Sequence, residues 1–80
     1  MLLNKIYKNL LKILPAKIKY DLKQSQIRWL RFYNYEKAFL RSMYYPSRGS
    51  MYRTALNLAL MNLKKARVLQ LADYFAMNNE

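Results

Sequence analysis

The chain has 80 residues, a formal net charge of +11 at pH 7 and 54% hydrophobic residues, with neither cysteine nor histidine. The absence of cysteine excludes a disulfide and a thiolate nucleophile, and the absence of histidine excludes the usual neutral-pH base and metal ligand. The four carboxylates, Asp21, Glu36, Asp73 and Glu80, are too widely spaced to form a catalytic pair unless the fold gathers them. We therefore expect no enzyme activity, no cofactor and no metal.

The size and charge of the chain limit its fold and its partners. A single domain of this length buries only about 60% of the surface that its unfolded chain exposes, so we expect a thin core. The net charge of +11 favours phosphate, anionic lipid or an acidic protein as partner. Lysine and arginine are scattered rather than clustered, which also fits a charge that serves only solubility. No stretch approaches the roughly 20 apolar residues of a transmembrane helix.

Residues 1–14 are predicted to form an amphipathic helix. Apolar side chains recur there at helical spacing, namely Leu3, Ile6, Tyr7, Leu10, Leu11 and Leu14. We interpret this segment as a packing helix, with a membrane-surface helix or a transit peptide as alternatives. It lacks the uninterrupted apolar core of a secretory signal. Pro15 ends this helix and suits the first turn of the next, because its fixed φ matches a helix start.

A second helix is predicted from about Ala16 to Tyr44, with a length of about 43 Å. It should be a spine against which two shorter helices pack. Its apolar residues recur at steps of 7 and 4 and so share one face: Leu22, Trp29, Tyr33, Leu40 and Tyr44. Gln26 and Glu36 lie on the same face and need polar partners. Trp29, in the middle of this face, is expected in the core.

The segment 46–49 is predicted to be a turn, in which Gly49 adopts a left-handed conformation and Ser50 caps the next helix. The third helix, Met51 to about Met77, is apolar over more than half of its circumference and should be covered on two sides. These elements predict one all-α domain over residues 1–80, with a short first helix, a long central helix and an antiparallel third helix.

Four stretches in this order resemble one known family. They are LNKIYKNLLKILP at 3–15, LKQSQIRWLRF at 22–32, GSMY at 49–52 and LKKARVLQL at 63–71. Together they resemble the lysozyme-inhibitor LprI-like family, whose domain is helical and exported. The positions that match the family pattern are Leu3, Asn4, Tyr7, Leu10, Gln26, Trp29, Phe32, Glu36, Gly49 and Arg67.

The chain also departs from the family pattern. Tyr33 and Asn34 replace its Arg-Asp pair, Lys37 replaces a cysteine, and Lys64 replaces a threonine. The disulfide that the resemblance implies between the second and third helices therefore has no cysteines to form it. The resemblance implies a periplasmic or exported protein. The missing cysteines, and a start without a signal, fit a reducing compartment such as the cytoplasm.

The resemblance implies a non-catalytic protein that binds a lysozyme-like enzyme. Lysozymes of the c-type are themselves basic, and two cationic surfaces repel each other. An alternative is a basic protein that binds nucleic acid through a flank of the second helix, with Tyr35 and Phe39 stacking on bases, although no recognised nucleic-acid motif is present. A third alternative is a helical subunit of a larger assembly. The predicted partner-binding residues are Arg28, Arg31, Tyr35, Lys37 and Arg41.

The predicted structural residues are Gln26, Trp29, Glu36, Gly49 and Arg67. We expect an ion pair between Glu36 and Arg67, because a lone carboxylate near the apolar face would need a donor. A turn near residues 47 and 48 places position 59 opposite Glu36, so this ion pair requires staggered helices. Otherwise Tyr7 or Asn4 of the first helix would supply the donor.

Overall fold

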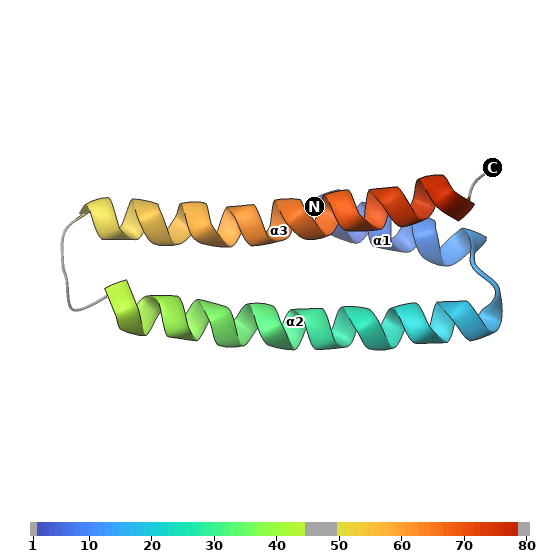
Figure 1. The fold of residues 1–80 in the computed structure, drawn as a ribbon, viewed down its shortest axis with the longest axis horizontal. Helices are drawn as coiled ribbons and strands as arrows, with labels where there is room; N and C mark the ends of the chain where they lie inside the picture. The colour runs from blue at the N-terminus through green and yellow to red at the C-terminus, as the bar shows by residue number, and fades with distance from the viewer. Residues whose placement is uncertain (1, 45–49, 79–80) are drawn as a thin grey trace.

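The computed structural model describes residues 2–44 and 50–78, which form three helices (Figure 1). These are α1 Leu2–Ile13, α2 Ala16–Tyr44 and α3 Ser50–Asn78, so the predicted all-α fold is confirmed and the predicted boundaries agree to within one residue. The backbone N–H of Lys19 donates to the carbonyl of Pro15 at 2.7 Å, which places the proline at the start of α2. The predicted turn and Gly49 lie outside the described residues.

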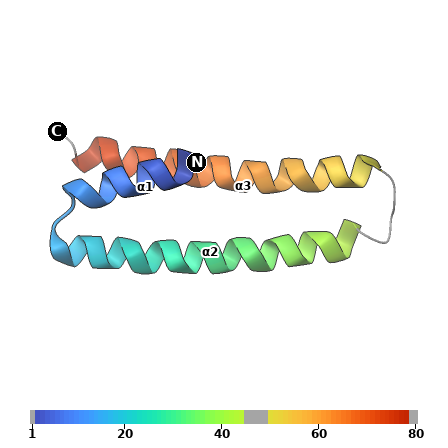
Figure 2. The same ribbon diagram turned by 180° about the vertical axis from the view of Figure 1, so that it is seen from behind.

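Helices α2 and α3 form a long antiparallel hairpin, and α1 lies alongside the C-terminal half of α3 (Figures 1 and 2). The molecule measures 48 × 19 × 16 Å, and its radius of gyration is 15.5 Å. A compact domain of this length would have a radius of gyration of about 12 Å. The fold is therefore a rod in which α1, about 18 Å long, covers less than half of the hairpin.

The expectation that α2 is a spine for two shorter helices is wrong. Helix α3 has the same length as α2, 29 residues, and α1 packs mainly on α3 rather than on α2. The physical reason lies in the side chains, because α3 offers Val68, Leu71 and Phe75 at helical spacing to the buried leucines of α1. Helix α3 thus makes the main contacts with both other helices.

The core lies where all three helices overlap. Its buried members are Leu3, Leu10, Leu14, Leu22 and Leu71. Trp29 packs against this cluster but is only half-buried, which corrects the expectation that it is a core residue. Helix α1 begins near the middle of the hairpin, so few side chains remain beyond that point to enclose a large indole ring (Figures 1 and 2). The core is thin, as the short chain length predicts.

The part of the hairpin beyond α1 leaves large apolar side chains in solvent. Helix α2 exposes Leu30, Phe32, Tyr35, Phe39 and Met43, and α3 exposes Leu58 and Met61. The prediction that α3 is covered on two sides is therefore wrong for this part of the helix, because α1 does not extend along it (Figure 2). Leu40 of α2 is buried in this region. Exposed apolar surface of this kind is typical of interaction sites.

Candidate protein-interaction site

A buried arginine joins α2 to α3 in the part of the fold that contains the core. Arg67 Nε donates to Gln26 Oε1 at 3.0 Å, and both residues are 6% exposed. Arg67 also donates through Nη2 to Ser25 Oγ at 3.2 Å and through Nη1 to Gln70 Oε1 at 2.5 Å. Burial lowers the pKa of Arg67, an effect that the nearby Tyr74 partly offsets. The guanidinium stays charged at neutral pH, because an arginine side chain is not deprotonated in proteins.

The predicted ion pair between Glu36 and Arg67 is wrong. The contact between Gln26 and Arg67 sets an axial register in which the position opposite Glu36 is near Asn57. That position lies about 15 Å from Arg67 along α3, too far for an ion pair. Among the described side chains the ion pair is instead Lys17 with Asp21 at 2.9 Å, on an exposed turn of α2. Gln26 was correctly expected to need a polar partner. For Arg67, however, the predicted partner was the carboxylate of Glu36, whereas the observed acceptor is the neutral amide oxygen of Gln26.

Next to the arginine, two aromatic rings continue the contact between the long helices. Trp29 and Tyr33 of α2 are stacked, with ring centroids 5.4 Å apart. The ammonium group of Lys64 on α3 lies 5.3 Å from the centroid of the Tyr33 ring, within the range of a cation–π contact. Tyr33 and Lys64 are two of the positions that depart from the family pattern, and the structure shows that they contact each other.

The predicted partner-binding residues do not form one surface. All five lie on α2, which is continuous from Ala16 to Tyr44. At about 100° per residue, Arg28, Arg31 and Tyr35 lie within about 60° of one another. Lys37 and Arg41 lie on the opposite side of the buried face, and Lys37 is half-buried. The helix therefore separates the predicted set into two groups.

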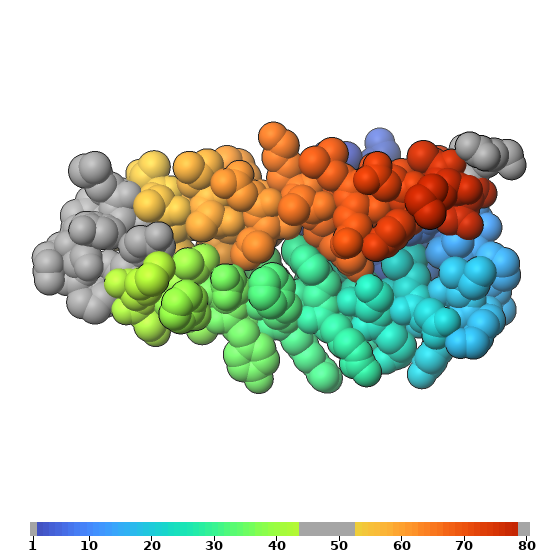
Figure 3. Space-filling view, viewed as in Figure 1, coloured from blue at the N-terminus to red at the C-terminus, as the bar shows by residue number. Residues whose placement is uncertain are grey.

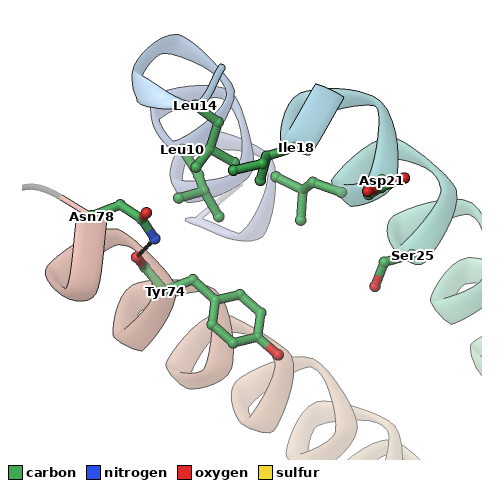
Figure 4. Close-up of a pocket in the computed structure, with 8 residues that line it drawn as sticks. Leu10, Leu14, Ile18, Asp21, Ser25, Tyr74 and Asn78 are labelled. Carbon is green, nitrogen blue, oxygen red and sulfur yellow. Dashed lines mark hydrogen bonds between the residues drawn. The ribbon is translucent and has the colours of Figure 1, made fainter. Parts of the chain in front are cut away.

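An open pocket of about 270 Å³ lies between the C-terminal end of α1, the N-terminal end of α2 and the C-terminal end of α3 (Figure 4). Its lining residues are Leu10, Leu14, Ile18, Asp21, Leu22, Ser25, Tyr74 and Asn78. Most of these present apolar surface, and Asn78 Nδ2 donates to the Tyr74 carbonyl at 2.8 Å. Because the pocket is open and its lining is mostly apolar, it is suited to an apolar side chain.

The α2 wall of this pocket continues along the same helix face into an exposed row of side chains. Ile18, Asp21 and Ser25 line the pocket. Steps of three or four residues lead from Ser25 to the residues that we call the α2 stripe: Arg28, Phe32, Tyr35, Phe39 and Met43. All five stripe side chains are exposed, and α2 occupies the lower edge of the molecule in Figure 3.

Part of this stripe was predicted from the sequence and part was not. Arg28 and Tyr35 were predicted as partner-binding residues and Phe39 as a stacking residue, whereas Phe32 entered only as a position that matches the family pattern. Met43 was not singled out. The signal that would have found both is their position on the wheel, since each lies about 60° or more from the Leu22 and Leu40 line of the buried face.

The described part of the chain contains neither a candidate metal site nor a candidate membrane-spanning helix. No group of three or more carboxylate, histidine or cysteine side chains in residues 2–44 and 50–78 is placed to hold a metal ion. Within the same residues, no helix is both long enough and apolar enough to cross a bilayer.

A family model described as "Lysozyme inhibitor LprI" matches residues 1–71 of the 80. The chain belongs to the LprI family. No curated protein and no solved structure matches it. The matched region contains all five core leucines, the contact between Gln26 and Arg67, and the whole α2 stripe. The LprI family is described by inhibition rather than by catalysis, which agrees at the family level with the non-enzymatic role that the composition predicts.

Proposed function

We propose that this protein is a non-catalytic inhibitor that acts by binding a lysozyme-like enzyme. The observation that carries the proposal is the family match over residues 1–71, which covers α1, α2 and most of α3. Inhibition by binding needs a pre-ordered surface rather than reactive groups, because ordering a loop on binding would reduce affinity. Helices joined by a buried arginine contact provide such an ordered scaffold.

The part of the hairpin that α1 leaves uncovered supports a role in binding. Tyr35 is 78% exposed and Phe39 is 57% exposed, although both are large aromatic side chains. Aromatic residues and arginine contribute most of the binding energy at many protein interfaces. The α2 stripe combines three aromatic side chains with Arg28 on a continuous helix, which keeps their spacing fixed.

The charge of the protein restricts which enzymes it can bind well. A net charge of +11 slows the encounter with a basic enzyme and favours one with an acidic surface. We therefore expect the inhibited enzyme to carry carboxylates around the surface that α2 contacts. Binding of nucleic acid has less support, because the five predicted partner-binding residues are divided between two sides of α2.

The test is an inhibition assay with purified components. Peptidoglycan lysis by a panel of lysozymes, ranging from strongly basic to acidic, is measured with increasing amounts of the protein. We expect saturable inhibition of at least one enzyme, strongest for those with acidic surfaces and weaker at high salt. Absence of inhibition across the panel, with the protein shown to be folded by circular dichroism, would contradict the proposal.

A further inference from the structure

We propose that the pocket and the α2 stripe form one continuous docking surface for an acidic protein segment, which seats an apolar side chain in the pocket. This inference rests on the proposed function and deepens it by naming the surface and the chemistry of the partner. Two observations support it: one face of α2 carries both the pocket wall and the stripe, and the chain carries few carboxylates in this region.

The geometry makes the pocket and the stripe neighbours. Ser25 lines the pocket, and Arg28 follows it by one helical turn on the same face of α2. From Arg28 to Met43 the stripe covers 15 residues, or about 22 Å of helix. A partner segment of that length would contact the aromatic rings along the stripe and would reach the pocket at one end. In this arrangement the pocket holds an apolar side chain of the partner, and the stripe contributes further contact area.

Charge identifies the partner as acidic. Between Asp21 and Asp73 the sequence contains a single carboxylate, Glu36. Of the cations in the same interval, Arg28 and Arg31 lie on the stripe side of α2, whereas Lys37 and Arg41 lie on the other side of the buried face and Arg67 is buried. A second copy of this chain on the stripe would place like charges together, which costs affinity, whereas an acidic segment would find complementary charge.

The charges at the pocket itself do not oppose this partner. Asp21 is the carboxylate of the pocket lining, and its Oδ2 atom lies 2.9 Å from Nζ of Lys17, so its charge is paired. Arg28, one turn beyond Ser25, is available for a partner carboxylate, and Arg31 lies beside it at the i+3 position. An acidic segment would therefore meet two cations next to the apolar anchor.

The composition of the surface favours protein over nucleic acid. Apart from Arg28 the stripe consists of Phe32, Tyr35, Phe39 and Met43, and the pocket beside it is mostly apolar. Nucleic-acid affinity depends on many cations that contact successive phosphates, and this face of α2 does not provide such a row. A protein segment with apolar residues on one face and acidic residues beside them matches the apolar surface and the neighbouring cations.

The first arm of the test measures binding to synthetic peptides. The probes are a helical peptide of glutamate and leucine with leucines at i, i+3 and i+4 spacing, and a matched peptide with lysine in place of glutamate. We expect the acidic peptide to bind and the basic one to bind at least tenfold more weakly, with the difference reduced by salt. Equal binding of the two peptides would overturn the charge argument. A single-stranded oligonucleotide that displaces the acidic peptide at physiological salt would assign the surface to nucleic acid instead.

The second arm uses variants with matched controls. The double variant Tyr35→Ala and Phe39→Ala should weaken binding of the acidic peptide by about tenfold or more, because exposed aromatic anchors are lost. The control is Leu58→Ala with Met61→Ala on α3, where side chains of similar exposure, 51% and 59%, are removed outside the stripe. The loss of acidic-peptide binding in the charge variant Arg28→Glu is compared with the loss in Lys65→Glu, a control on α3 outside the stripe. Equal losses in the stripe and control variants would overturn the proposal.

These outcomes separate the docking surface from the proposed function. If a lysozyme is inhibited equally by the stripe variants and by the unmodified protein, the proposed function stands and the docking surface is wrong. If the acidic peptide binds through the stripe but no lysozyme is inhibited, the docking surface stands and the proposed function is wrong. Circular dichroism of every variant establishes that a loss of binding is not a loss of fold.

Discussion

Arg67 of α3 donates its Nε hydrogen to the Oε1 atom of Gln26 on α2, at 3.0 Å and with both residues 6% exposed. A cation is thus buried against neutral oxygen acceptors, since its other partners are Ser25 and Gln70. Burying a charge is costly unless its hydrogen bonds are made. Each acceptor therefore matters for stability, and the contact also fixes the axial register of the two long helices.

The first prediction is a coupling between Gln26 and Arg67. In a double-mutant cycle with Gln26→Leu and Arg67→Leu, we expect a coupling of about 1.5–3 kcal/mol in the free energy of unfolding, as for hydrogen bonds to charged groups. Gln26→Leu should be the more damaging single change, because it leaves a buried guanidinium short of an acceptor. Urea unfolding of the four proteins gives the values. A coupling below about 0.5 kcal/mol would show that the contact is energetically unimportant.

A control for this cycle is Glu36. Glu36 is half-buried and lies about 15 Å along the helices from the level of Arg67. A cycle that combines Glu36→Gln with Arg67→Leu should therefore give additive effects within about 0.5 kcal/mol. Strong coupling between these residues would mean that Glu36 and Arg67 do interact, which would contradict the axial register of the two helices.

The second prediction compares two leucines on α3. Leu71 is 0% exposed in the core, whereas Leu69 is 57% exposed. Leu71→Ala should lower the free energy of unfolding by about 2–5 kcal/mol, because it removes packed atoms and leaves a cavity. Leu69→Ala should change it by no more than about 0.5 kcal/mol. Thermal unfolding followed by circular dichroism tests both, and similar melting temperatures for the two variants would contradict the position of the core.

A third prediction concerns two adjacent lysines. Lys64 lies over the Tyr33 ring, with Nζ 5.3 Å from the centroid, whereas Lys65 is exposed. Lys64→Met should cost about 0.5–1 kcal/mol of stability through the lost cation–π contact, and Lys65→Met should be close to neutral. The same denaturant experiment measures both. An equal effect of the two substitutions would mean that the ring contact contributes nothing.

The extent of each helix was predictable from the sequence, but the way in which the helices pack was not. Pro15 and the apolar periodicity gave boundaries within one residue, and Leu22, Gln26 and Leu40 do lie on the buried face of α2. Periodicity fixes the angle of a residue about the helix axis. It does not fix the axial offset between two helices, which depends on which side chains interlock.

Because the axial offset between the helices could not be predicted, the predictions for particular residues were wrong. Glu36 and Arg67 were correctly expected near the boundary of apolar faces, but their axial levels differ, so Gln26 takes the place of Glu36. Trp29 lies on the predicted face but near the point where α1 begins, so it is only half-buried. Phe32 and Met43 are a different case, because both lie about 60° or more from the line of Leu22 and Leu40, so their exposure was predictable from the periodicity.

Nuclear magnetic resonance of the protein with the enzyme that it inhibits can show whether a lysozyme-like enzyme binds through the α2 stripe. We expect the side-chain signals of Phe32, Tyr35 and Phe39 to shift or broaden at stoichiometric enzyme, while those of Leu58 and Met61 on α3 stay in place. Changes confined to α1 or to the Leu58 and Met61 region, with the stripe signals unaffected, would contradict binding through the stripe.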